Sequence, residues 1–127
     1  MVVTEPGAIV VVGGEAILGA AVVASLEASG RRVIATSHRR GPAPLDLAAA
    51  AATWPIPAGV TAACICAAVT SIDDCRRFPR AAEAVNVTGT ITLARRLVAA
   101  GVRVVFPSSS LVFDGTRPRP RSATTQA

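Results

Sequence analysis

Apolar residues along this chain follow two different spacings, and the spacing changes several times. Short runs rich in β-branched residues predict buried strands, whereas apolar residues three or four positions apart predict helices. The predicted strands are 9–12, 32–36, 61–68 and 102–106. The predicted helices are 17–29 and about 79–100. A glycine directly after each helix, Gly30 and Gly101, provides the expected stop signal.

Strands that alternate with helices favour a doubly wound parallel sheet with three layers, α/β/α. The run 61–68 is apolar throughout, which is typical of a central parallel strand that helices cover on both faces. We expect one domain over 1–115, truncated after about five strands. An irregular tail rich in Arg and Pro is expected over 116–127.

The segment 9–19 carries the strongest chemical signal, because a strand there leads through a glycine turn into a helix. Gly13 allows the turn, Gly14 would let a phosphate approach the backbone, and Gly19 would let the helix pack closely on the strand. Unpaired N–H groups and the dipole at a helix start favour an anion such as a pyrophosphate. Ala16 stands where the dinucleotide fingerprint has its middle glycine, so an ordinary strand–helix turn is the alternative.

Composition and charge exclude several classes of function. The net charge is +5 and all thirteen basic residues are arginine, largely in dispersed pairs. A nucleic-acid surface requires clustered cations with interleaved aromatic residues, and this pattern is missing. The longest nearly apolar run, 60–69, is too short to span a bilayer. Without a basic and then apolar leader at its start, the chain is expected in the cytoplasm and not at a membrane.

The cysteines are expected to be reduced, buried thiols, as in other cytoplasmic proteins. Cys64 and Cys66 lie on the predicted strand 61–68, and we expect one of them on each face of the sheet. The chain has no CxxC motif, and His38 is its only histidine, so no metal site is expected.

Five motifs follow one another along the chain: the glycine turn, Leu45-Asp46-Leu47, Ala67-Ala68-Val69-Thr70-Ser71-Ile72-Asp73, Val85-Asn86-Val87-Thr88-Gly89-Thr90 and Ser108-Ser109-Ser110-Leu111-Val112-Phe113-Asp114-Gly115. In this order they resemble the extended short-chain dehydrogenase/reductase family. The branch most similar to this chain is that of the dTDP-4-dehydrorhamnose reductases and related sugar-nucleotide-binding proteins. The resemblance implies a Rossmann-type NAD(P)-binding domain.

The resemblance also implies roles for individual residues. The glycine turn would hold the pyrophosphate, Asp46 and Leu47 would face the adenine, and Ala67 and Ala68 would line the ribose on the nicotinamide side. Asn86 would steady the strand beside the active site, although a solvent-facing asparagine is the alternative. The full expected cofactor site is Gly13, Gly14, Ala16, Ile17, Leu18, Gly19, Ser37, Arg39, Arg40, Asp46, Leu47, Ala67, Ala68 and Asn86.

The end of the second predicted strand favours NADP over NAD. Relatives that prefer NAD carry an acidic residue there, which binds the ribose 2′-hydroxyl, but this chain has Ser37. Arg39 and Arg40 follow, and arginine can bind a 2′-phosphate bidentately. A solvated basic loop is the alternative, and NAD stays open as the cofactor.

Ser109 matches the position of the family's catalytic Ser or Thr, which bonds the substrate oxygen, whereas a serine that bonds its own backbone is the alternative. The family's Tyr-x-x-x-Lys pair has no counterpart, because the chain contains neither Tyr nor Lys. We therefore expect the NADP(H)-binding part of a nucleotide-sugar oxidoreductase, inactive alone, so that its status as an enzyme is open. Further chain would complete the sugar site, and a homodimer is compatible with the sequence. The alternatives are a non-catalytic NADP-binding regulatory subunit and an interaction module that pairs through its sheet edge.

Overall fold

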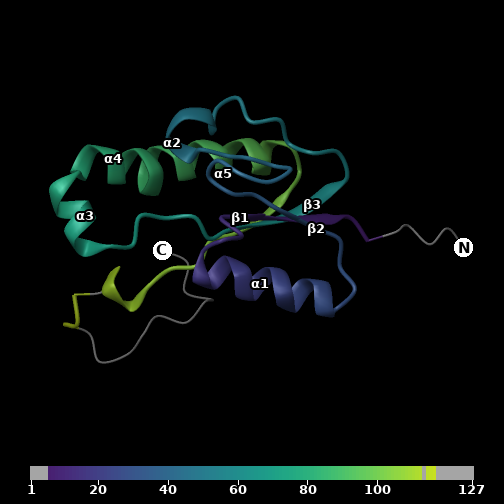
Figure 1. The fold of residues 1–127 in the computed structure, drawn as a ribbon, viewed down its shortest axis with the longest axis horizontal. Helices are drawn as coiled ribbons and strands as arrows, with labels where there is room; N and C mark the ends of the chain where they lie inside the picture. The colour runs from purple at the N-terminus through teal and green to yellow at the C-terminus, as the bar shows by residue number, and fades with distance from the viewer. Residues whose placement is uncertain (1–5, 113, 117–127) are drawn as a thin grey trace, which may run out of the picture.

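Four parallel strands form the centre of the computed structural model, which describes residues 6–112 and 114–116 (Figure 1). They lie in the order β2-β1-β3-β4. Their bounds are Ala8–Val12 for β1, Val33–Ala35 for β2, Val60–Ile65 for β3 and Arg103–Val105 for β4. All five residues of β1 are buried, because β2 and β3 pair with it on either side.

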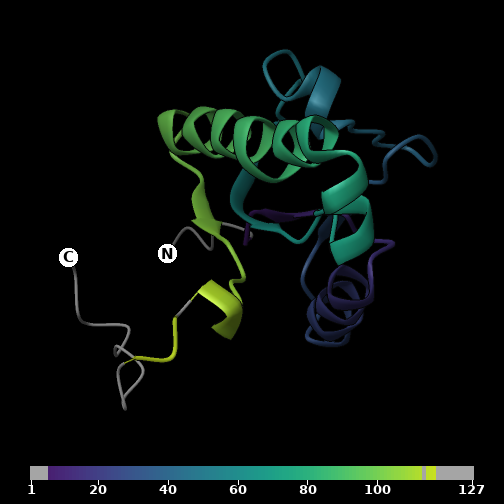
Figure 2. The same cartoon turned by 90° about the vertical axis from the view of Figure 1, so that its left-hand side faces the viewer.

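Helices cover both faces of this sheet, so the expected α/β/α arrangement is confirmed. Figures 1 and 2 show α1 on one face and α2 and α5 on the other. The helices are α1 Ile17–Ala28, α2 Leu47–Ala50, α3 Ile72–Arg77, α4 Pro79–Glu83, the π-helix η1 Ala84–Gly89, α5 Thr90–Ala99 and the 3₁₀-helix η2 Ser110–Val112. Because all four strands are parallel, their carboxyl ends meet at one edge, where ligands bind in sheets of this kind.

The main hydrophobic core lies on the face that α2 and α5 cover. Val10 and Val12 of β1 contribute to it, together with Leu93 and Leu97 of α5, which are fully buried. Each buried side chain of this size contributes about 1.5–3 kcal/mol relative to an exposed one. On the α1 face, in contrast, Val105 of β4 is 52% exposed.

The described residues contain four strands, which correspond to the four predicted segments, and the segment between β2 and β3 adds no further strand to the sheet. The segment between β2 and β3 holds Pro42, Pro44, Pro55 and Pro57. Proline has no N–H group to donate to a strand ladder, so this segment cannot form a regular strand. An isolated parallel bridge between Ser37 and Pro44 is formed instead.

The helical segments also differ in detail from the prediction. The predicted helix 79–100 is interrupted by the wider π-helical turn of η1, and α2 and α3 were not predicted. Both unpredicted helices begin at a capping side chain: Asp46 accepts from the N–H of Ala48, and Ser71 accepts from that of Asp74. These caps were visible in the sequence as signals of a helix start.

Cys64 and Cys66 lie on the same face of the sheet, so the expectation of opposite faces was wrong. Their Sγ atoms are 3.5 Å apart. In a strand, neighbouring residues alternate between faces, and residues two positions apart therefore share one. The three cysteines are free thiols and partly buried.

Among the helices of residues 6–112 and 114–116, none is both long enough and apolar enough to cross a bilayer. Most of the expected tail, 117–127, lies outside the described residues, and so does Phe113.

Replacing Gly19 by Ala should destabilise the protein, although alanine is the better helix former by about 1 kcal/mol. A Cβ atom at Gly19 would overlap the carbonyl oxygen of Gly13. Overpacking of this kind typically costs about 1–3 kcal/mol. The change is measured as the free energy of unfolding by urea denaturation.

Ser25→Ala is the matched control, because Ser25 is an exposed residue of the same helix. Ser25→Ala also raises helix propensity but adds no contact, so the stability of this variant should equal or slightly exceed that of the wild type. If Gly19→Ala were as stable as Ser25→Ala, the contact between α1 and the turn would not be a constraint.

Candidate functional site

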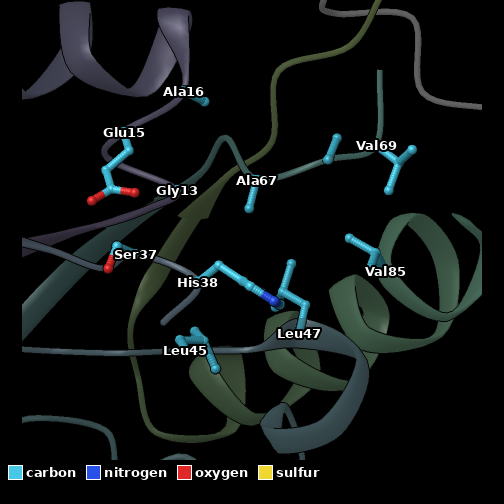
Figure 3. Close-up of a pocket in the computed structure, with 11 residues that line it drawn as sticks. Gly13, Glu15, Ala16, Ser37, His38, Leu45, Leu47, Ala67, Val69 and Val85 are labelled. Carbon is cyan, nitrogen blue, oxygen red and sulfur yellow. The ribbon is translucent and has the colours of Figure 1, made fainter. Parts of the chain in front are cut away.

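A cavity of about 310 Å³ opens at the carboxyl ends of β1, β2 and β3 (Figure 3). Its walls come from the glycine turn, the segment after β2, the start of α2, the segment after β3, and η1. The lining residues are Gly13, Glu15, Ala16, Ser37, His38, Leu45, Leu47, Ala67, Ala68, Val69 and Val85. Six of them were predicted as cofactor-binding residues: Gly13, Ala16, Ser37, Leu47, Ala67 and Ala68.

Gly13 satisfies two constraints that exclude a larger residue. Its φ angle is +81°, a left-handed conformation that glycine adopts without strain. A Cβ atom there would lie 2.7 Å from the Cα atom of Ala67, in the segment after β3. The Gly13 N–H donates to the hydroxyl oxygen of the buried Thr36, 3.2 Å away. The turn is therefore fixed against both neighbouring strands.

Gly14 faces β2 and not the cavity, which corrects the reason given for this glycine. A Cβ atom on Gly14 would lie 2.7 Å from the Cβ of Ala35, so a side chain here would overlap β2. The Gly14 N–H is also bonded, at 2.8 Å, to the carbonyl oxygen of Thr36. Gly14 is small because two strands and a turn converge there.

The start of α1 is open toward the cavity. Ala16 is its N-cap residue, which has an extended backbone and no side chain that could accept from the first N–H groups. Helix N-termini leave such groups without partners inside the helix, so they can meet an anion. The Ile17 side chain is 95% exposed and that of Leu18 is also exposed, and neither lines the cavity. Glu15, which was not predicted, does line it.

A tight loop follows β2. Ser37 is buried, and its Oγ donates to the Arg40 carbonyl oxygen and accepts from the Arg40 N–H. Arg39 and Arg40 are exposed and do not belong to the cavity lining, so their contact with a cofactor stays a prediction.

His38 is a cavity residue that the sequence did not reveal, because nothing in a lone histidine indicates where it points. Its Nε2 lies 3.8 Å from Oδ2 of Asp46, and its side chain lines the cavity (Figure 3). The other carboxylate oxygen of Asp46 caps α2. Asp46 itself does not line the cavity, whereas Leu45 and Leu47 on either side of it do.

Asn86 holds the segment after β3 in place. Its Oδ1 accepts from the N–H of Val69 at 2.8 Å, and its Nδ2 donates to the carbonyl oxygen of the same residue at 2.9 Å. Both polar ends of the side chain are thus used by Val69. Asn86 therefore acts on the cavity by positioning Val69, and a direct cofactor contact stays a prediction.

Ser109 lies in the exposed segment between β4 and η2, away from the lining of this cavity. Its carbonyl oxygen accepts from the N–H of Val112 at 3.2 Å. Further along the chain, the side-chain hydroxyl of Thr116 donates a hydrogen bond to the carboxyl group of Asp114, and so does the Thr116 backbone N–H. Both bonds lower the pKa of the Asp114 carboxyl group, and the hydroxyl has the larger effect. The catalytic role of Ser109 stays a prediction.

The remaining titratable groups offer no metal centre. Within 6–112 and 114–116, no three His, Cys, Asp or Glu side chains are grouped so that they could hold a metal ion. Burial, together with the hydrogen bond and the charge of neighbouring Cys64, raises the pKa of Cys66 to about 11.

Comparison with known proteins agrees with this geometry. A search of curated protein sequences gives no match. A short-chain dehydrogenase/reductase superfamily protein from Agrobacterium tumefaciens, solved with bound NAD, is 34% identical over 87% of this chain and 35% of its own, with a TM-score of 0.66. A dTDP-4-dehydrorhamnose reductase from Clostridium acetobutylicum is 25% identical over 94% of this chain and 42% of its own, with a TM-score of 0.76.

A third solved structure shares the fold at lower identity. The dTDP-4-dehydrorhamnose reductase from Bacillus anthracis, in complex with NADP, is 20% identical over 91% of this chain and 40% of its own, with a TM-score of 0.73. This chain therefore spans about 35–42% of the length of these proteins. The family model described as "RmlD substrate binding domain" matches residues 7–127. The chain belongs to the RmlD substrate-binding domain family.

Proposed function

We propose that this chain is the NADP(H)-binding part of an oxidoreductase that acts on a nucleotide-linked sugar. The observation that carries the proposal is the uncapped start of α1, which opens beside Gly13 into a cavity at the carboxyl ends of the strands. An anion at this position meets N–H groups and the positive end of the helix dipole. A pyrophosphate is the anion that the surrounding walls suit best.

The two sides of the cavity suit the two halves of a dinucleotide. On the β2 side, Leu45 and Leu47 provide an apolar surface for a base, and His38 and Ser37 stand where its ribose would lie. On the β3 side, the segment that ends at Val69 is fixed by Asn86 and carries only small or apolar side chains toward the cavity. The nicotinamide half would follow that segment.

The substrate class is supported by the family and by the similarity to the dTDP-4-dehydrorhamnose reductase from Clostridium acetobutylicum. When bound, the cofactor would exchange a hydride with a carbon atom of the sugar. The contribution of this chain would be to bind the cofactor, to exclude water through its apolar cavity walls, and to orient the sugar oxygen through the hydroxyl of Ser109.

A second candidate is a regulatory subunit that binds NADP without catalysis. The observation that favours it is the absence of Tyr and Lys from all 127 residues. The two candidates share the cofactor site and differ only in whether a proton donor is supplied to the sugar.

Introducing a carboxylate at the start of α1 should separate ligand binding from helix stability. Ala16→Asp and Ala16→Asn both add an N-cap side chain, which should stabilise the protein by about 1 kcal/mol. Only the aspartate adds negative charge beside the pyrophosphate, and repulsion at this range should weaken NADPH binding about tenfold or more. Calorimetric titration measures the affinities, and thermal unfolding measures the stabilities.

The reverse change is available at the neighbouring position. Glu15→Gln removes a carboxylate from the cavity wall and should tighten NADPH binding several-fold at low salt, with a smaller gain at high salt.

Equal NADPH affinity in the Asp and Asn variants of Ala16 would show that the pyrophosphate does not lie at the start of α1.

The preference for NADPH over NADH should depend on the two arginines after β2. If they reach the 2′-phosphate, the wild-type preference should be roughly tenfold or more, since a hydrogen bond to a charged group contributes about 1.5–3 kcal/mol. Arg39→Ala combined with Arg40→Ala should reduce this preference and leave NADH affinity unchanged. Arg76→Ala combined with Arg77→Ala, in the exposed helix α3, is the matched control for lost charge. Equal affinity of the wild type for the two cofactors, measured at one salt concentration, rules out this role.

The 127-residue chain should bind cofactor without reducing a nucleotide sugar. General acid catalysis typically contributes about 10²–10⁴-fold, and the family's tyrosine and lysine are absent from the sequence. NADPH absorbance is followed with a panel of 4-keto nucleotide sugars, and a complete relative serves as the positive control. Substrate-dependent oxidation that disappears in Ser109→Ala would contradict this expectation.

A further inference from the structure

Cys64 and Cys66 form a close pair of thiols outside the candidate cofactor cavity. Their Sγ atoms are 3.5 Å apart, and neither residue lines the cavity. The backbone holds both: Cys64 is within β3, and the N–H of Cys66 donates to the carbonyl oxygen of Val12 at 2.8 Å. The backbone positions of the two residues are therefore set by the sheet.

The pair lies on the side of the sheet that is less completely covered. Cys64 is in register with Val11 of β1 and Val105 of β4. None of these three residues belongs to the main core cluster, so this row faces the α1 layer. Helix α1 packs on β1 and β2, and Figure 2 shows β4 well away from it. Both cysteines are only partly buried, and the neighbouring Val105 is 52% exposed, so a small reagent can reach the thiols.

The sulfur–sulfur distance suits a bridging atom better than a disulfide bond. Two sulfur ligands that each lie about 2.3 Å from one central atom are about 3.3–3.8 Å apart for bond angles near 90–110°. A disulfide requires sulfur atoms about 1.5 Å closer than they are here. It would also have to span the roughly 6.6 Å between Cα atoms two residues apart in a strand, which is near the upper limit for disulfides.

The number of protein ligands at the pair limits which thiol-binding centre it can hold. Structural zinc sites use four protein ligands. In the described ranges, no third Cys, His, Asp or Glu joins the pair to make a metal site. The third thiol, Cys75, points elsewhere, because its Sγ donates to the carbonyl oxygen of Val69. The pair thus suits a centre that is satisfied by two sulfur atoms.

We propose that Cys64 and Cys66 form a dithiol site for a soft centre that takes two sulfur ligands, such as a trivalent arsenical with one organic group. In the binding step, both S–H bonds break and two As–S bonds form. The oxygen of the arsenical leaves as water with the two protons. Arsenic stays trivalent, so the reaction requires no oxidant or reductant.

The test uses phenylarsine oxide and the reduced 127-residue chain. One equivalent should remove two of the three free thiols, counted with a chromogenic disulfide, and intact mass should show one adduct formed with loss of water. Cys75→Ser should keep this reaction and its affinity. Cys64→Ser and Cys66→Ser should each bind roughly 100-fold more weakly, because a single thiol loses the advantage of two linked bonds.

Cys66→Ala is a second test in case Cys66→Ser does not fold. It should fold, because Cys66 follows the last residue of β3 and is outside the main core. Far-ultraviolet circular dichroism confirms that each variant is folded. A small dithiol should release the arsenical, whereas a monothiol at the same thiol concentration should not. Wild-type affinity in folded Cys66→Ala, or loss of binding in Cys75→Ser, would overturn the proposal.

Discussion

The close approach of three backbone segments at the glycine turn is the constraint on which the rest of the structure depends. Gly13 lies against Ala67 of the segment after β3, and Gly19 brings α1 against the carbonyl oxygen of Gly13. The N–H groups of Gly13 and Gly14 are bonded to Thr36 at the end of β2. One turn therefore sets the relative positions of three strands and a helix, and the cavity is the space that this arrangement leaves.

The two faces of the sheet differ in how completely helices bury them. On the α2 and α5 face, the core is continuous, and Arg96 ties α5 to α2 through a hydrogen bond of 2.8 Å to the carbonyl oxygen of Ala51. Helix α1 buries only Gly19 and leaves most of its side chains in solvent. The stability of the domain thus rests mainly on one face, and the chemistry of the candidate cofactor site is placed at the strand ends.

The sequence was sufficient where a local signal determines the outcome. The β-branched run at 9–12 and the apolar spacing of 17–29 predict β1 and α1 to within one residue at each end. Ala16, Ser37 and Ala67 were found in the same way, because they stand directly after strands or at a helix start. Each of these features is encoded within a few residues of the chain.

The sequence was insufficient where distant residues determine the outcome. The role of Gly14 depends on Ala35, twenty-one positions away, and the cavity position of His38 depends on how the loop of Ser37 closes on Arg40. The thiol pair was misjudged for a different reason, since the two-residue period of a strand does place Cys64 and Cys66 on one face. All four strand segments that the sequence identified, 9–12, 32–36, 61–68 and 102–106, correspond to β1 to β4.

The paired hydrogen bonds of Asn86 have a consequence for the energetics of any ligand that touches Val69. A connecting segment at the mouth of a cavity normally loses conformational entropy when a ligand orders it. Here one amide side chain already bonds both backbone groups of Val69, as a neighbouring strand would. The segment is ordered during folding, before any ligand arrives. The cavity wall beside β3 is therefore preorganised. The conformational entropy of this segment is lost when the protein folds, which lowers the stability of the free protein. It is not lost again when a ligand binds, so it does not lower the affinity of the complex.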